Sequence, residues 1–308
     1  MGTNTFHLLL AEADEQGYHI TKRERLAVKI GMGGINEGYI TNDGIHRALL
    51  AMLSFKNTID QQGVQQVFAF GTSALRNAKN GKEVAQQIKE MTGIEVNIID
   101  GDQEAEFIYY GVRAAMHLEN HKSLIIDIGG GSVEFIIGDN DHIYWKKSIE
   151  IGAQRLLEKF HSRDPITDED ISHLNEYLST ALMPVFEALA QFPTNIMVGS
   201  SGTFDTLSDI FCIQHDIHKT IEETETPLTL AGFEEIYHQL VSKNRIERLQ
   251  MPGMIEMRVD MIVVACCLIR YLLNHHPFNR IRVSTYSLKE GVLAALIQRI
   301  VPEQHATK

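Results

Sequence analysis

Apolar and polar positions at the start of the chain predict a β-hairpin followed by a helix. Two largely apolar runs, Phe6 to Ala13 and Tyr18 to Ile30, flank a short polar turn at residues 15–17. Such runs around a glycine-containing turn are typical of paired antiparallel strands. Apolar residues then recur at helical spacing from Ile45 to Ile59, directly after the polar segment 42–44. This spacing predicts an amphipathic helix.

Strand-like and helix-like segments alternate through the next part of the chain. Val64 to Phe70 and Ile94 to Ile99 are short apolar runs typical of strands. Lys82 to Met91 and Gln103 to Met116 are interpreted as helices, the first of them closed by Gly93. A strand-then-helix alternation predicts a sheet with helices packed against it.

The same pattern begins again after a polar segment at residues 119–122. The expected strands are Ser123 to Ile128, Val133 to Gly138, Ile143 to Ile149, Asn195 to Val198 and Arg280 to Ser284. The expected helices are Ala153 to Phe160, Asp168 to Leu189, a segment from Phe204 onward, Phe233 to Leu240, Ile255 to Leu273 and Leu288 to Ile300. Because no low-complexity segment interrupts the chain, the polar segment at 119–122 is the best domain boundary.

Length and composition favour a globular protein of two domains. The chain has 308 residues, of which 44% are hydrophobic and 22% are charged, and domains usually contain about 100–200 residues. Its longest apolar stretch, Met261 to Ile269, is far shorter than the roughly 20 residues that cross a bilayer. No basic segment precedes the first apolar run, and three cysteines cannot form a disulfide framework. We therefore expect a soluble cytoplasmic protein with no membrane partner.

The charge balance limits the kinds of ligand that the surface can attract. The 28 Lys and Arg residues against 40 Asp and Glu residues give a formal net charge of −12. Duplex nucleic acid is therefore not an expected partner. An anionic ligand must instead be held locally, by backbone amides, helix N-termini, a few arginines or a metal ion.

The strongest local motif runs from Asp127 to Glu134 and contains three consecutive glycines. Glycines after an apolar strand allow a tight turn and expose backbone amides to an anion. Asp127 and Glu134 would face one cavity from the two arms of a hairpin. Paired carboxylates beside a phosphate loop are ligands that suit a hard cation such as Mg²⁺. The alternative is a glycine-rich β-turn that binds no ligand.

Other small-residue and charged segments have ordinary structural explanations on local sequence alone. Gly199–Thr203 resembles a phosphate loop before a helix, although serine and glycine are also common helix caps. Gly31–Gly34 is interpreted as a flexible turn. The acidic run 100–106 is interpreted as a charged helix start, and Arg76 as a surface cation. No histidine cluster has metal-ligand spacing, and neither a Walker A motif nor a nucleophile elbow is present.

Taken together and in order, these segments resemble the exopolyphosphatase and guanosine pentaphosphate phosphohydrolase family of the actin-like ATPase superfamily. The resemblance covers essentially the whole chain. The segments that carry it are 2–7, 72–78, 101–105, 127–134, 199–203 and 289–293. The motif at 127–134 and the Ser-Ala-Leu-Arg sequence ending at Arg76 are specific, whereas the wider superfamily shares the glycine loops.

The resemblance implies an α/β fold with two ribonuclease-H-like domains and a phosphate-holding cleft between them. Residues 1–118 would form the first domain, completed by the last helix at 288–308, and residues 119–287 the second. It further implies that Glu104 is the general base for the attacking water, and that Asp127 and Glu134 are catalytic carboxylates that organise Mg²⁺. The phosphate-binding residues implied by it are Thr3, Asn4, Thr5, Arg76, Gly129, Gly130, Gly131, Ser132, Gly199, Ser200, Ser201, Gly202 and Thr203.

This chain departs from the family pattern at several positions. The first family motif reads Asp-x-Gly, and Met1 occupies its middle position, so we expect further residues before Met1 in a functional enzyme. Val133 replaces the usual threonine, and Gln103 and Glu106 replace the usual glutamate and arginine of Glu-Glu-Ala-Arg. Losing that arginine is expected to weaken affinity for long polyphosphate. Longer members carry extra C-terminal helical domains, which we do not expect after the final helix.

The resulting prediction is a Mg²⁺-dependent hydrolase of phosphoanhydride bonds. Its substrates would be inorganic polyphosphate, guanosine pentaphosphate or both, and a homodimer is a candidate assembly. One alternative is an ATPase or kinase of the same superfamily, although no clear adenosine-binding glycine pair follows Gly202. Another is a non-catalytic sensor of an alarmone or polyphosphate, which the presence of Glu104, Asp127 and Glu134 disfavours.

Overall fold

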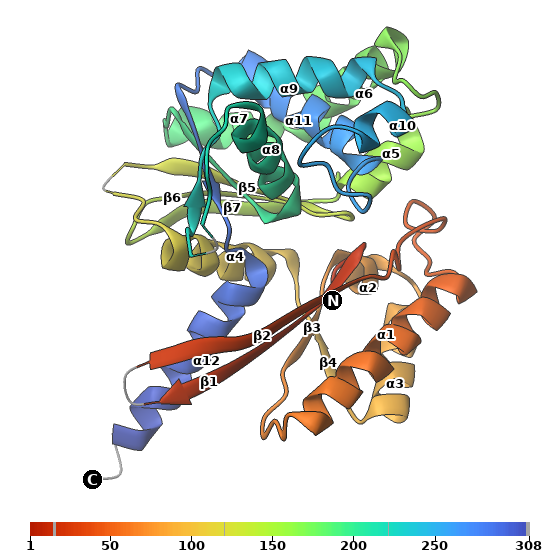
Figure 1. Cartoon of the computed structure of the whole chain (residues 1–308), viewed down its shortest axis with the longest axis vertical. Coiled ribbons are helices and arrows are strands. Elements are labelled where there is room, and N and C mark those ends of the chain that lie inside the picture. Colours follow the sequence, from red (N-terminus) through yellow and green to blue (C-terminus); the bar gives the residue numbers. More distant parts are fainter. Residues whose placement is uncertain (15–16, 120, 221, 306–308) are drawn as a thin grey trace.

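The computed structural model describes residues 1–14, 17–119, 121–220 and 222–305. The described chain forms two α/β halves that meet around helix α4 (Gly101–Ala115), as Figure 1 shows. The turn predicted at residues 15–17 includes residues 15 and 16, which lie outside this description. No helix among the described residues is both long enough and apolar enough to span a bilayer.

A six-stranded sheet forms the centre of the second half. Its strand order is β7 (Ile143–Ile149), β6 (Val133–Gly138), β5 (Ser123–Ile128), β8 (Ile196–Ser200), β10 (Arg280–Ser284) and β9 (Glu225–Thr226). Strands β5, β6 and β7 are antiparallel neighbours, whereas β8 is parallel to both β5 and β10. Every residue of β5 and β6 is buried, because helices cover this part of the sheet on both faces.

Helices α5 to α11 belong to this half, and all of them except α10 contribute buried side chains to the main hydrophobic core. They are α5 (Ala153–Phe160), α6 (Asp168–Ala181), α7 (Met183–Gln191), α8 (Ser201–Gln214), α9 (Leu230–Ser242), α10 (Arg245–Leu249) and α11 (Met261–His275). The single helix predicted from Asp168 to Leu189 is wrong, since it breaks at Leu182. Pro184 lies in the first turn of α7 and has no amide hydrogen to continue the preceding helix. The helix predicted from Ile255 begins only at Met261.

The first half contains two separate pairs of strands rather than the one sheet that the sequence pattern predicts. An antiparallel hairpin joins β1 (Thr5–Asp14) to β2 (Gly17–Ala27), and β3 (Ala69–Gly71) is parallel to β4 (Val96–Ile98). The strand predicted from Val64 to Phe70 is shorter than expected. Only the three residues of β3 pair with residues of β4. The helices of this half are α1 (Asn42–Gln61), α2 (Ser73–Asn77) and α3 (Gly81–Thr92).

Helix α4 and the last helix, α12 (Leu288–His305), pack together between the two halves. Helix α4 lies against β6 and β7, and α12 runs beside α4 and also touches β1 (Figure 1). Their backbones approach closely because both helices have a glycine there. A Cβ on Gly111 would lie 2.1 Å from the Ser287 carbonyl oxygen, and one on Gly291 would lie 1.7 Å from that of Phe107. This packing fixes the first turn of α4 over the sheet.

Candidate active site

Three acidic side chains gather where α4 meets the six-stranded sheet. Asp127 on β5 lies directly opposite Glu134 on β6, so both side chains share one face of the sheet. That face is the one covered by α4, whose first turn carries Glu104. Gly101 permits this approach, because a Cβ there would lie 2.4 Å from Cβ of Ser148 on β7. The predicted hairpin arrangement of Asp127 and Glu134 therefore matches the strand register.

Burial makes these three carboxyl groups unusual. Glu104 and Asp127 are each 6% exposed, and Glu134 is 1% exposed. Burial raises the pKa of each group, and the neighbouring carboxylates raise the pKa values of Glu104 and Glu134 further. Oε1 of Glu134 accepts hydrogen bonds from the hydroxyls of Ser132 and Ser148, both at 2.7 Å. The cluster is therefore rich in carboxyl oxygens, and burial disfavours the ionised form of each group unless a cation compensates it.

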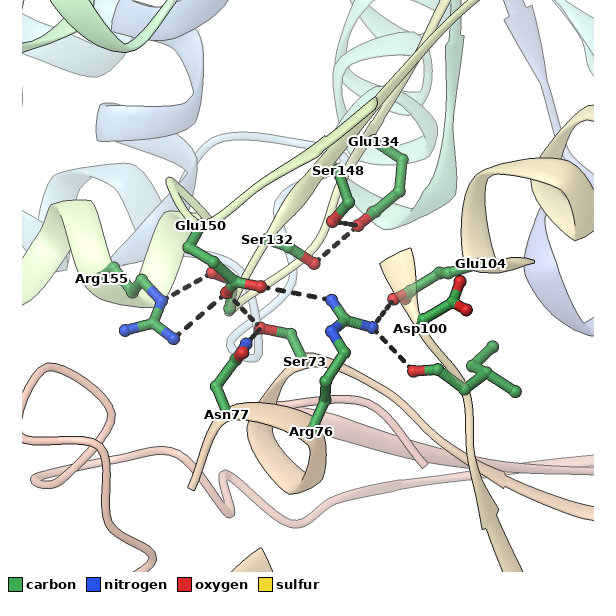
Figure 2. Close-up of polar contacts among 12 residues, drawn as sticks. Ser73, Arg76, Asn77, Asp100, Glu104, Ser132, Glu134, Ser148, Glu150 and Arg155 are labelled. Atoms are coloured by element: carbon green, nitrogen blue, oxygen red, sulfur yellow. Dashed lines mark hydrogen bonds and ion pairs between the residues drawn. The ribbon is translucent and has the colours of Figure 1, made fainter. Parts of the chain in front are cut away.

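Arg76 joins this cluster to the first half of the chain, as Figure 2 shows. Its Nη1 donates to Oε2 of Glu104 at 2.8 Å and to the Ile99 carbonyl oxygen at 3.1 Å. Its Nη2 donates to Oε1 of Glu150 at 3.3 Å. Glu150 also accepts from the Ser73 hydroxyl at 2.7 Å. The local interpretation of Arg76 as a surface cation is wrong, since its side chain is only 15% exposed.

The glycine loop between β5 and β6 turns its carbonyl groups away from this cluster. The three carbonyl oxygens of the loop accept hydrogen bonds from backbone amides at the start of α5. The amide of residue 152 donates to Gly131, that of residue 153 to Gly129 and that of residue 154 to Gly130. Across the described chain, the amides of Gly130 and Gly131 donate to no protein acceptor. Two adjacent free amides of this kind form an anion-binding concavity. The loop therefore has the backbone arrangement that a phosphate oxygen requires.

The N-terminal segment 2–5 reaches the glycine loop from the first half. A Cβ on Gly130 would lie 2.4 Å from Nδ2 of Asn4, and one on Gly131 would lie 2.6 Å from Oγ1 of Thr3. Nδ2 of Asn4 donates to the Met261 sulfur at 2.6 Å, and its buried Oδ1 has no partner in the described part of the protein. Thr3, Asn4 and Thr5 are all buried. The two predicted phosphate loops are thus in direct contact.

The loop before α8 lies on the other side of Asp127. The Ser200 hydroxyl donates to Oδ2 of Asp127 at 2.9 Å. Ser201 has a φ of +69°, a left-handed conformation that is strained for serine and common at functional sites. No side chain caps α8, so its first-turn amides, including those of Gly202 and Thr203, are available to an anion. Gly199 differs from the other residues of this loop in having a packing role, because its α-carbon lies against the Phe204 ring within the core.

Arg258 is a second cation at this site, and no sequence motif pointed to it. A Cβ on Gly202 would lie 2.1 Å from Nη2 of Arg258, so only glycine admits the guanidinium there. Its Nε is buried and has no hydrogen-bond partner among the described residues. Ser73, Ser148 and Glu150 were also missed. A signal that could have found Arg258 is its place just before the continuous apolar run from Met261 to Ile269, where a cation needs a specific reason.

Asp127 and Glu134 are the carboxylates whose chemistry suits Mg²⁺. Magnesium prefers oxygen ligands and is often bound by one or two carboxylates together with substrate phosphates. Asp127 and Glu134 fit this description, because both are buried oxygen ligands with neighbouring negative charge. Within the described residues no three acidic, histidine or cysteine side chains converge as a complete protein-only metal site. Asp127 and Glu134 could therefore hold such an ion only together with other oxygen ligands, such as substrate phosphates.

Comparisons with known proteins show the family to which this chain belongs. A family model described as the Ppx/GppA phosphatase family matches residues 9–300. The crystal structure of an exopolyphosphatase from Cytophaga hutchinsonii is 44% identical over 97% of this chain and 96% of that chain, with a TM-score of 0.94. A putative exopolyphosphatase from Haemophilus influenzae is 25% identical over 96% of this chain and 89% of its own length.

A longer relative is named for a different activity. The guanosine-5′-triphosphate,3′-diphosphate pyrophosphatase of Pseudoalteromonas translucida is 26% identical over 99% of this chain. The chain spans 59% of the length of that relative.

Proposed function

Since the chain belongs to the Ppx/GppA phosphatase family, we propose that it hydrolyses terminal phosphoanhydride bonds of inorganic polyphosphate or guanosine pentaphosphate. The observation that carries this proposal is the position of Glu104 beside the Asp127–Glu134 pair and the free amides of Gly130 and Gly131. A carboxylate base, oxygen ligands for a cation and a phosphate loop thus occupy one place.

Glu104 is the proposed general base. Its Oε2 is held by Nη1 of Arg76 at 2.8 Å, which fixes the direction of the carboxylate. The water oxygen bonds to the terminal phosphorus while its proton passes to Glu104. The bridging P–O bond breaks, and the shortened chain leaves with that bond's electrons. Burial raises the pKa of Glu104, which brings its basicity closer to that needed near neutral pH.

The remaining groups position the phosphates and offset their charge. The amides of Gly130 and Gly131 and those in the first turn of α8 are directed donors, and Arg76 and Arg258 supply positive charge. Phosphoryl transfer depends mainly on such positioning and electrostatic stabilisation. Mg²⁺ bound at Asp127 and Glu134 would neutralise negative charge that develops on the phosphoryl oxygens.

This local arrangement would allow an acidic protein to bind a polyanion. The formal net charge of −12 opposes long-range attraction of a polyanion. Lys22, Arg23 and Arg25 on β2 are exposed, and the charge of Arg25 acts on Arg258. Cytoplasmic action is supported by three buried, unpaired cysteines, Cys212, Cys266 and Cys267.

Orthophosphate release from three substrates tests the proposal. One purified sample is assayed with polyphosphate, guanosine pentaphosphate and ATP, each with and without Mg²⁺. Release from polyphosphate or guanosine pentaphosphate well above release from ATP supports the proposal. Release from ATP alone would indicate a superfamily ATPase, and binding of guanosine pentaphosphate or polyphosphate without any release would indicate a sensor.

A further inference from the structure

Glu150, the residue directly after β7, accepts hydrogen bonds from three side chains that belong to both halves of the chain. Its Oε1 accepts from Nη2 of Arg76 at 3.3 Å, and its Oε2 accepts from the Ser73 hydroxyl at 2.7 Å and from Nη2 of Arg155 at 3.2 Å (Figure 2). The side chain of Glu150 is 39% exposed, whereas those of Arg76 and Arg155 are 15% and 12% exposed. A carboxylate that is accessible to solvent therefore occupies donors that are mostly buried.

Both arginines are held in place by acceptors other than Glu150. Arg76 is fixed through Nη1, whose two acceptors were described above. Arg155 donates from Nε to the Gly131 carbonyl oxygen at 2.8 Å and from Nη1 to the Ile35 carbonyl oxygen at 2.6 Å. Each guanidinium therefore keeps its position when Glu150 moves away, and its Nη2 then becomes a free donor.

The three donors lie between the phosphate loop and the proposed general base. A Cβ on Gly131 would lie 2.4 Å from Oγ of Ser73, so this hydroxyl adjoins the loop. Nδ2 of Asn77 donates to the same Oγ at 3.2 Å and helps to hold it there. Arg76 is paired with Glu104. Two guanidinium groups and a hydroxyl are donors that suit the oxygens of a phosphate as well as those of a carboxylate.

We propose that Ser73, Arg76 and Arg155 form a phosphate subsite that Glu150 occupies in the absence of substrate, so that Glu150 competes with a substrate phosphate. This inference rests on the proposed function, because it identifies a residue that limits affinity for the phosphorylated substrate. The Glu150 carboxylate offsets positive charge on both arginines and repels an approaching phosphate. Its displacement costs little, because ion pairs of solvent-accessible side chains contribute little to stability.

Glu150→Gln and Glu150→Ala test the competition directly. Calorimetry measures the affinity for inorganic tripolyphosphate without added Mg²⁺, and initial rates with Mg²⁺ measure KM for polyphosphate and guanosine pentaphosphate. Both variants should bind tripolyphosphate about three- to tenfold more tightly, the gain expected if Glu150 fills the subsite about two-thirds to nine-tenths of the time. The KM values should fall by a similar factor. Thermal melting checks that each variant folds.

Glu158→Gln is the matched control for a contact between the two halves. Glu158 on α5 accepts from the Gly33 amide at 3.1 Å and from Nδ2 of Asn36 at 3.2 Å, both in the first half. It does not contact the three donors of the subsite within the described structure. Glu158→Gln should therefore leave tripolyphosphate affinity within about twofold of that of the unmodified protein, because it frees no donor of the subsite.

Ser73→Ala provides a readout that a purely structural role of Glu150 would not change. In the unmodified protein the substitution weakens both the phosphate and its competitor, so affinity should change less than about twofold. In the Glu150→Ala background only the phosphate is weakened, and Ser73→Ala should cost about threefold or more.

The outcomes distinguish the subsite from the proposed function. If the unmodified protein hydrolyses neither substrate, the proposed function fails, and tripolyphosphate binding still tests the subsite. The subsite is overturned by unchanged or weaker binding in both Glu150 variants, by no detectable binding in either, or by an equal gain in Glu158→Gln. A loss of affinity in both Glu150→Gln and Glu158→Gln would instead assign Glu150 to holding the two halves together.

Discussion

Gly202→Ala tests the role of Arg258 without removing any charge. A Cβ at residue 202 would lie 2.1 Å from Nη2 of Arg258 and 2.7 Å from its Nε. Ordinary contact begins near 3.4 Å, so the guanidinium must retreat by about 1.3 Å. This retreat costs little stability, because the guanidinium is the far end of a flexible side chain. It would break the proposed hydrogen bonds from Arg258 to a phosphate, because hydrogen bonds weaken steeply with distance and angle.

The size of the effect follows from the bonds that are lost. A hydrogen bond to a charged group contributes about 1.5–3 kcal/mol, which corresponds to roughly tenfold to a hundredfold in affinity. We therefore expect the KM for guanosine pentaphosphate to rise by that factor, while kcat changes less. Initial rates of orthophosphate release against substrate concentration measure both constants. The melting temperature should stay within about 2 °C of that of the unmodified protein.

A double-mutant cycle distinguishes displacement of Arg258 from simple blocking of the α8 amides. Arg258→Met should itself raise KM, and adding Gly202→Ala to it should then change KM by less than about threefold. The reasoning is refuted if Gly202→Ala has no effect alone, or if it keeps its full effect when Arg258 is absent.

Three further predictions concern the carboxylate cluster and the extent of the binding site. Burial raises the pKa of Glu134, so its contribution to stability is intact at acidic pH and lost as pH rises through the raised value. Without divalent cations, Glu134→Gln should therefore raise the melting temperature at pH 8 by a few degrees, because each pKa unit corresponds to about 1.4 kcal/mol. At pH 5 the increase in melting temperature should be much smaller. A lower melting temperature of the variant at pH 8 would contradict this prediction. Excess chelator should abolish turnover and Glu134→Gln should raise the Mg²⁺ concentration needed for half-maximal rate, whereas full activity in chelator would remove the metal from the account. The KM per chain end should change little with polyphosphate length and only weakly with salt concentration, because a local site contacts few phosphates. A KM that keeps falling steeply as the polyphosphate chain lengthens to hundreds of phosphate units would instead indicate an extended basic channel.

The carboxylate pair could be predicted from the sequence because its geometry is local. Asp127 and Glu134 end and begin two apolar strands on either side of a short glycine loop, and that loop length fixes their register. Side chains directly opposite each other in an antiparallel pair share a face. Strand periodicity and one tight turn were therefore enough to place both carboxylates together.

Glu104 and Arg76 could not be placed from local sequence, because their environment is made by distant residues. An acidic helix start also has an ordinary capping role, and Asp100 has it, since its Oδ1 accepts from the Gln103 amide at 2.7 Å. Arg76 is buried by partners 28 and 74 residues away, Glu104 and Glu150. Only the family resemblance pointed to Glu104 and Arg76.

Arg258 shows a different limit of sequence analysis. It follows an irregular segment and belongs to no recognisable spacing. Its significance comes from the missing partner of its buried Nε, which is evident only once the chain is folded. The break between α6 and α7 is the opposite case, because Pro184 was visible in the sequence and outweighed the apolar periodicity.

The most direct test of the account is the rate of Glu104→Gln with guanosine pentaphosphate. The substitution removes the proton acceptor with almost no change in volume, and loss of a general base typically costs about 10²–10⁴-fold in rate. Asp102→Asn, an exposed acidic residue in the same turn of α4, is the matched control and should keep full activity. The account predicts a kcat reduced by that order in Glu104→Gln, with guanosine tetraphosphate binding retained within a few-fold. A kcat of Glu104→Gln within a few-fold of the unmodified protein would contradict it.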